Sequence, residues 1–190
     1  AKEQRTQELL AFAVEAALQT GASVRCYAVR GEVHLALETE AVVAGRWSEE
    51  VLSMKASAEA PALARIPLRA GAMRVFISDL LFPAEPESLL APLGSRHGRG
   101  IVFAPHAFQE SAPAWNGNYD FIDAETQQQH EHRVESDILQ SYLRAYSRHF
   151  DLWKKASAKH GIALARVSAE DDFISALRSE GLGSNAVEAT

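Results

Sequence analysis

The sequence predicts an α/β fold of the doubly wound class, in which helices cover both faces of a mostly parallel sheet. After residue 72, apolar runs with strand character alternate with helical patterns, as expected of parallel strands joined by crossover helices. Before residue 72, two short β runs are close enough in sequence to form an antiparallel hairpin at an edge of the sheet. Residue usage agrees with a folded globular chain, because 47% of the residues are hydrophobic and 23% are charged.

The chain length predicts a single domain. Its 190 residues suffice for one sizeable hydrophobic core and are too few for two comfortable domains. We expect the domain to cover residues 1–182, and we expect residues 183–190 to form a flexible tail.

The first part of the chain is predicted to contain a helix and the hairpin. Apolar residues recur at helical spacing over 3–20, and Gly21 follows where a left-handed C-cap belongs. Apolar and polar residues alternate over 23–29, and a second β run covers 33–38. Cys26, the only cysteine, lies in the first of these runs, so we expect it to be buried and without a disulfide.

The middle of the chain is predicted to hold the centre of the sheet. A short helix over 47–57 precedes an irregular stretch over 58–72 that is rich in small residues and proline. The run 73–77 is apolar on both faces, which predicts a strand that is covered on both sides and central in the sheet. A helix over 87–96 and a second buried strand over 100–104 follow.

The last part of the chain is predicted to form a second hairpin, the longest helix, a strand and a final helix. The hairpin pairs 118–122 with 130–134 around a polar turn. The long helix covers 136–160 and carries one apolar stripe. The stripe consists of Ile138, Leu139, Tyr142, Leu143, Tyr146, Phe150 and Trp153. A strand over 162–167 leads to residues 168–171, which resemble a capping box that opens the final helix.

Charge and cysteine content narrow the class of partner and the compartment. The formal net charge of −6 and the dispersed basic residues argue against a partner that is nucleic acid or anionic lipid, and favour a protein. A single cysteine fits a reducing compartment, so we expect a cytoplasmic protein. No stretch approaches the roughly 18 apolar residues that a membrane helix needs.

Three segments carry a resemblance to a known family. They are residues 74–81, which read Arg-Val-Phe-Ile-Ser-Asp-Leu-Leu, residues 123–126, and the long helix with the 161–164 and 172–177 segments that follow it. In combination they resemble the von Willebrand factor A-like family of unknown function that is encoded beside MoxR-type AAA+ ATPases. The likeness is best over the last two thirds of the chain. It implies a von Willebrand A-like fold and a non-enzymatic module that binds another protein, with a MoxR-type ATPase or a client of that ATPase as the partner.

The resemblance also implies a magnesium site. In that fold, three loops supply the hydroxyl and carboxylate oxygens that a hard Mg²⁺ prefers, and open positions receive a partner's carboxylate. Asp79 matches the aspartate of the third loop. No Asp-x-Ser-x-Ser matches the first loop, and residues 60–72, where the second loop should fall, contain no Thr or Ser. We therefore expect an incomplete or degenerate site with Asp79 as its metal ligand.

A central strand precedes the first helix in this family. Either this strand and its Asp-x-Ser-x-Ser loop lie upstream of Ala1, which is the interpretation we favour, or the sheet is built differently. Asp79 also has a simpler interpretation, as a residue that caps the turn after its strand.

Two other groups of polar residues have simple interpretations. His130 and His132 are spaced i, i+2, which puts both imidazoles on one face of a strand, but no third metal ligand accompanies them in sequence. Exposed strand histidines are therefore the favoured interpretation. Asp120, Asp123 and Glu125 are interpreted as turn residues rather than as acid–base carboxylates.

Catalysis finds little support in the sequence. Neither a nucleophile-elbow motif nor a glycine-rich phosphate-binding motif occurs, so nucleophilic catalysis and nucleotide binding are disfavoured. Two alternatives to a binding module stay open, because fold does not decide function. One is a metal-dependent hydrolase that combines Asp79 with histidines brought in by folding, and the other is a structural scaffold without metal.

Overall fold

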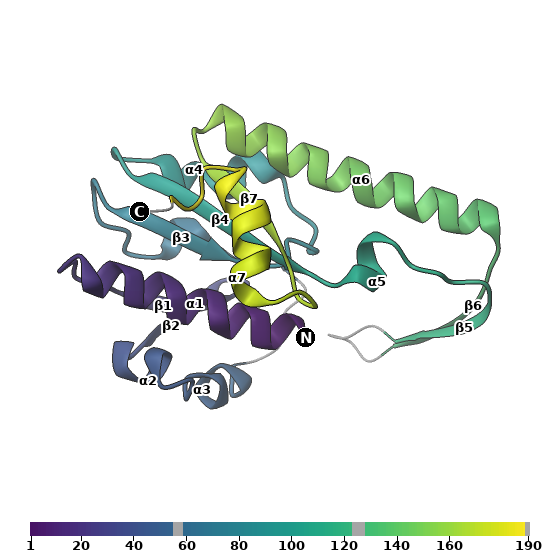
Figure 1. Ribbon diagram of the computed structural model, residues 1–190, viewed down its shortest axis with the longest axis horizontal. Coiled ribbons are helices and arrows are strands. Elements are labelled where there is room, and N and C mark those ends of the chain that lie inside the picture. The colour runs from purple at the N-terminus through teal and green to yellow at the C-terminus, as the bar shows by residue number, and fades with distance from the viewer. Residues whose placement is uncertain (55–58, 123–127, 189–190) are drawn as a thin grey trace.

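The computed structural model describes residues 1–54, 59–122 and 128–188 (Figure 1). Its helices are α1 (Lys2–Gln19), α2 (Thr39–Val43), α3 (Ser48–Leu52), α4 (Pro86–Gly94), α5 (Phe108–Ser111), α6 (Ser136–Lys159) and α7 (Phe173–Ala176). Its strands are β1 (Cys26–Arg30), β2 (Val33–Leu37), β3 (Met73–Ile77), β4 (Arg99–His106), β5 (Gly117–Ile122), β6 (Gln129–Val134) and β7 (Ala163–Ser168). A 3-10 turn, η1 (Leu63–Arg65), and a π-helical segment, η2 (Leu177–Leu182), are also present.

β3, β4 and β7 form a three-stranded parallel sheet with β4 in the middle. Val102 of β4 lies opposite Phe76 of β3 and Leu164 of β7. Helical segments connect these strands, so the α/β class predicted from the alternation of patterns is confirmed.

β3 is an edge strand of this sheet, so the prediction that residues 73–77 are central was wrong. Its outer side pairs with no strand in the described ranges. Met73 and Val75, which point to the same face, are 61% and 39% exposed, so the prediction that both faces of this strand are covered was wrong as well. The apolar pattern correctly located the strand. It could not show which strand pairs beside it or how fully each face is covered, because an apolar pattern indicates only that the residues favour burial.

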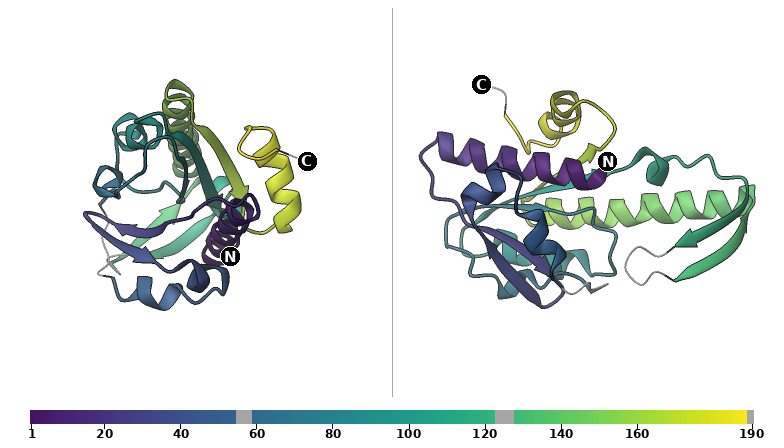
Figure 2. Two further views of the ribbon diagram at one scale, coloured as in Figure 1. Left: turned by 90° about the vertical axis from the view of Figure 1, so that its left-hand side faces the viewer. Right: turned by 90° about the horizontal axis from the view of Figure 1, so that it is seen from below.

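Helices cover both faces of the parallel sheet, as predicted (Figure 2). Successive residues of β4 point to opposite faces. On one face Val102 joins a core with Leu90 of α4 and Trp153 of α6. On the other face Phe103 joins a core with Leu9 of α1 and with residues of β7 and α7.

Arg74 is the one charged residue of β3, and its side chain lies against the C-terminal end of α4. Its side chain is 4% exposed and donates hydrogen bonds to the carbonyl oxygens of Pro92 (2.6 Å), Leu93 (3.1 Å) and Ser95 (2.7 Å). Carbonyls at the C-terminal end of a helix lack intrahelical partners, and a cation there also offsets the negative end of the helix dipole. Gly98 permits this arrangement, because a Cβ at this position would lie 2.4 Å from the Arg74 Cζ.

β1 and β2 pair antiparallel as predicted, but they form a separate two-stranded sheet. The described residues therefore do not form one doubly wound sheet with this hairpin at its edge, and this part of the prediction needs correction. The hairpin has its own small core, in which Cys26 and Leu37 meet Val14 of α1 and Val42 of α2. Since α1 also buries Leu9 against the parallel sheet, one helix holds the two sheets together.

β5 and β6, which we call the arm, form a third sheet, which is antiparallel. The arm and the first half of α6 extend away from the parallel sheet (Figures 1 and 2). The predicted turn over 123–127 lies outside the described residues. α6 matches its predicted range closely, whereas α3 covers only the beginning of the predicted helix over 47–57, part of which also lies outside the described residues.

The final helix begins later than predicted. Asp172 caps α7, because its side chain accepts a hydrogen bond from the Ser175 backbone nitrogen at 3.1 Å. The proposed capping box at 168–171 was wrong, since Ser168 is the last residue of β7. Within the segment predicted as a tail, Ala186 is buried in the same core as Leu177.

Candidate functional site

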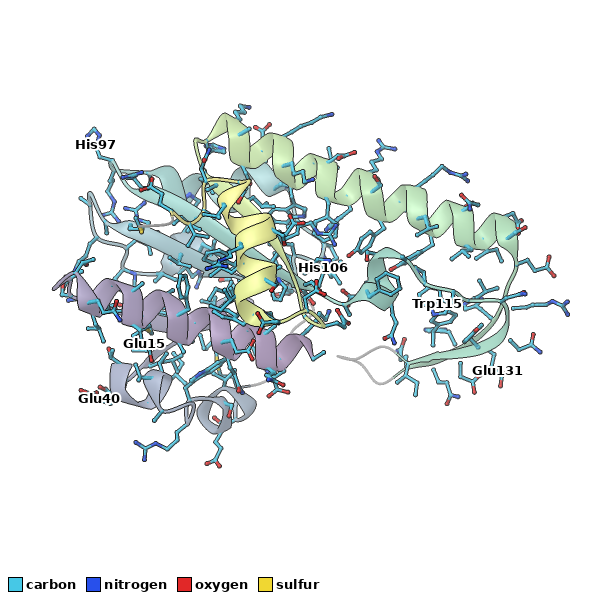
Figure 3. All side chains as sticks on the ribbon, viewed as in Figure 1. Glu15, Glu40, His97, His106, Trp115 and Glu131 are labelled. Carbon is cyan, nitrogen blue, oxygen red and sulfur yellow. The ribbon has the colours of Figure 1, made fainter. Side chains whose placement is uncertain are left out.

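The carboxyl ends of β3, β4 and β7 meet at one edge of the parallel sheet, which we call the carboxyl edge. His106 and Ser168 are the last residues of β4 and β7, and Asp79 follows β3. Figure 3 shows His106 on the side of the sheet from which the chain continues toward the labelled Trp115 and Glu131. Ligands of open parallel sheets bind outside the carboxyl ends of the strands, so we expect a functional site at this edge.

Asp79 is held in a fixed position at this edge. Its Oδ1 accepts a hydrogen bond from the Leu81 backbone nitrogen at 3.2 Å, which is the turn-capping role expected of an aspartate after a strand. Its Oδ2 lies 2.8 Å from the Nζ of Lys2, in the first turn of α1. The Asp79 side chain is 37% exposed, so it remains accessible from solvent.

Lys2 joins two carboxylates from different elements. Its Nζ also lies 2.5 Å from Oε1 of Glu110 in α5. Burial lowers the pKa of Lys2, but hydrogen bonds and charges from Asp79 and Glu110 outweigh this effect and hold the pKa above its ordinary value. The ammonium therefore stays charged at neutral pH between the two carboxylates.

Glu110 has structural partners as well. Its Oε2 accepts a hydrogen bond from the Ala107 backbone nitrogen at 3.1 Å, and its backbone oxygen accepts one from the Tyr142 hydroxyl at 2.9 Å. Glu110 thus connects the start of α5 to α6 while its other carboxylate oxygen faces Lys2.

His106 and Arg166 form a second polar group on the same sheet. Burial lowers the pKa of His106, and the positive charge of Arg166 lowers it further, so the imidazole is neutral at neutral pH. Arg166 donates to the Tyr146 hydroxyl at 2.5 Å, and its guanidinium lies 3.9 Å from the centre of the Phe150 ring. The His106 Nδ1 is buried and has no hydrogen-bond partner among the described residues.

The turn after β3 has an unusual backbone. Leu80 has a φ of 61°, in the left-handed region, and its side chain is fully buried. Residues other than glycine adopt this backbone conformation at a cost in free energy, so the surrounding contacts must impose it. Such strain immediately after Asp79 sets this turn apart from the ends of β4 and β7.

The donors at the carboxyl edge do not by themselves fit Mg²⁺. Two carboxylates meet at one point, but the Lys2 ammonium lies there, and Mg²⁺ requires six ligands in octahedral geometry. Within the described ranges, no group of three or more His, Cys, Asp or Glu residues is arranged to hold a metal ion.

The remaining residues singled out from the sequence lie elsewhere. His130 and His132 are exposed on one face of β6, with ring centres 6.3 Å apart, as predicted for strand histidines. Asp120 is an exposed residue of β5 opposite Glu131, not a turn residue. Asp123 and Glu125 lie outside the described residues.

Cys26 is buried and free of disulfide bonds, as predicted, and burial raises the pKa of its thiol. A shallow apolar depression of about 250 Å³ lies between η1 and α4 and is lined by Ala60, Leu63 and Leu89 among others. None of the carboxyl-edge residues lines it, and Glu85 and Ser88 are the only polar residues in its lining, so we do not regard it as the functional site.

Sequence reasoning identified Asp79 but missed Lys2, Glu110 and His106. No sequence pattern placed Lys2 at this edge, because α1 connects no two described strands of the parallel sheet. His106 follows the predicted strand over 100–104 by two residues, so it could have been placed at the carboxyl edge in the same way as Asp79. Glu110 belongs to α5, a single turn that no sequence pattern indicated.

No helix in the described part of the chain is both long and apolar enough to cross a membrane. Comparisons with protein-family models, with curated proteins and with solved structures found no significant match for this chain.

Proposed function

We propose that this chain is a non-enzymatic protein-binding module of the von Willebrand A-like type, which engages its partner through the carboxyl edge around Asp79. The observation that supports this proposal is the Asp79 carboxylate, which is 37% exposed and fixed by Lys2 and by the Leu81 backbone. A preorganised charged group at an accessible edge favours the choice of one partner over others, because the geometry need not form during binding.

The proposed partner is a MoxR-type AAA+ ATPase in the cytoplasm. The resemblance of residues 74–81 and of the C-terminal segments to the MoxR-associated family supports this choice. The net charge of −6 is in keeping with a protein partner, since it disfavours anionic polymers.

We include in the proposal a Mg²⁺ ion that binds at Asp79. The resemblance supports this ion, whereas the Lys2 ammonium competes with it for the same oxygens.

The binding proposal is tested by titrating a purified MoxR-type ATPase into the protein and its variants by calorimetry. We expect Asp79→Asn, which removes one charge and little volume, to weaken binding by about tenfold or more, the loss typical of one interfacial charge pair. Asp151→Asn, an exposed aspartate on α6, is the matched control and should bind as the unaltered protein does. Equal binding by all three proteins contradicts the role of Asp79 and leaves the structural scaffold as the better interpretation.

The metal proposal needs a separate titration with Mg²⁺ alone. We expect Lys2→Met to bind Mg²⁺ more tightly than the unaltered protein, because the competing ammonium is gone while Asp79 and Glu110 remain. Asp79→Asn in the Lys2→Met background should abolish the heat of binding. The absence of Mg²⁺ binding in Lys2→Met would show that the metal part of the proposal is wrong, whatever the result with the ATPase.

A further inference from the structure

The left-handed turn that presents Asp79 is held from several sides. The Ser78 hydroxyl accepts a hydrogen bond from the Leu80 backbone nitrogen at 3.2 Å, and the Asp79 carboxylate accepts one from the Leu81 backbone nitrogen at the same distance. The Leu80 side chain is buried in the core beneath α4 and α6. These contacts account for the nitrogens and the side chain, but not for the Leu80 carbonyl, which the left-handed backbone turns toward α6.

His149 of α6 provides the contact with that carbonyl. Its Nε2 lies 2.7 Å from the Leu80 backbone oxygen. A carbonyl oxygen only accepts hydrogen bonds, so the contact is attractive only when Nε2 carries a proton. With the proton on Nδ1, two lone pairs would face each other at 2.7 Å in a partly buried site.

Trp153 competes for the same nitrogen. Its indole nitrogen lies 3.0 Å from the His149 Nε2. The indole N–H is only a donor, so one imidazole nitrogen cannot accept from Trp153 and donate to Leu80 at the same time. The shorter distance is that to Leu80, which favours the form of His149 with the proton on Nε2.

We infer that His149 is a positioning residue for Asp79, and that the proton on its Nε2 holds Leu80 in the left-handed conformation that directs the Asp79 carboxylate toward Lys2. Through His149, α6 acts at the carboxyl edge, a role that its apolar stripe does not suggest. The functional meaning of this contact rests on the proposed function of Asp79, but the hydrogen bond itself is testable without any partner.

Two variants of His149 separate hydrogen bonding from packing. His149→Gln keeps a donor and adds a separate acceptor, so the Gln amide can donate to Leu80 and accept from Trp153. His149→Leu replaces the imidazole with an apolar side chain and removes the hydrogen bond to Leu80. The readout is amide hydrogen exchange at Leu81, whose N–H is bound by the Asp79 carboxylate.

We expect exchange at Leu81 to accelerate by about tenfold in His149→Leu, as for the loss of a typical buried hydrogen bond, and to stay close to the unaltered rate in His149→Gln. The Ser175 amide is the matched control, because the Asp172 side chain caps it in the same way far along the chain. The Val102 amide in the central strand reports on opening of the whole domain. ¹⁵N chemical shifts of the imidazole in the unaltered protein should show the proton on Nε2.

Three results would each overturn the inference. They are a His149 proton on Nδ1, equal loss of Leu81 protection in both variants, and loss at Leu81 no greater than at Val102. The ¹⁵N shifts of the unaltered protein decide the question even if His149→Leu does not fold. The inference about His149 and the proposed function fail separately. Normal ATPase binding by Asp79→Asn would contradict the proposed function, but exchange at Leu81, Ser175 and Val102 would still test the hydrogen bond of His149.

Discussion

The two halves of α6 carry one continuous apolar stripe but differ in what covers it. In the second half Phe150 and Trp153 are 3% and 0% exposed, because the parallel sheet and α4 lie beneath them. In the first half Ile138 is 49% exposed and Tyr142 is only half-buried, with Trp115 as its neighbour near the arm. The period of a stripe therefore predicts a helix and its inner side, whereas burial also depends on the size of the layer that faces it.

The largest effect is expected at Trp153. Trp153→Ala should lower the free energy of unfolding by about 3–5 kcal/mol, because it leaves a large cavity between α6 and the sheet. The neighbouring Leu152, which is 48% exposed, provides the control, and Leu152→Ala should change stability by less than about 1 kcal/mol. Urea unfolding monitored by circular dichroism measures both. A decrease of less than about 1 kcal/mol in the free energy of unfolding of Trp153→Ala would contradict the view that the second half of α6 is tightly packed.

A local effect is expected from Trp115. Its ring packs within 5.2–6.5 Å, between ring centres, of Tyr119, Phe121 and Tyr142, and so links the arm to α6. We expect Trp115→Ala to accelerate amide exchange in β5 by about tenfold and to leave the Val102 amide unaffected, since the arm opens without the sheet. Equal acceleration at both places would mean that the arm and the sheet unfold as one unit.

A smaller effect is expected in the pH dependence of stability. The folded-state pKa of His106 is depressed, so the unfolded chain binds a proton more readily as the pH falls below about 6.5, the ordinary histidine value. The stability that His106 contributes is present above that pH and is lost as the pH falls toward the depressed folded-state value. His106→Gln should therefore lose less stability between pH 7 and pH 5 than the unaltered protein. Equal losses of stability in the two proteins would contradict a depressed pKa of His106.

The smallest effect is expected at Ile138. Ile138→Ala should lower the free energy of unfolding by less than about 1 kcal/mol, although the same change in a core costs about 2–5 kcal/mol. Urea unfolding at two protein concentrations is the measurement. A large loss, or a loss that depends on concentration, would show that another surface covers the first half of α6.

Within the candidate site, only the residues that follow a predicted strand could be placed from the sequence. Asp79 follows a run that is recognisable as a buried strand, and parallel sheets place ligand-binding groups after such strands. Lys2 and Glu110 come from α1 and α5, far from Asp79 in sequence, and only packing brings their charges to one point. His149 lies on a helix whose pattern explains its packing, and no periodicity reports a hydrogen bond to a carbonyl 69 residues away.

The sequence by itself determined α1, α4 and α6, both hairpins and the strands of the parallel sheet. These features depend on residues close together in the chain, and the 3.6-residue and two-residue periods report them directly. Tertiary structure alone decided that β3 is an edge strand, that the β1–β2 hairpin stands apart, that the first half of α6 is half-exposed, and that Asp79 meets Lys2 and a strained turn. Each of these depends on which segments, distant in sequence, pack together. An apolar or charged pattern indicates that a side chain is buried or paired, but it does not identify the residues that contact it.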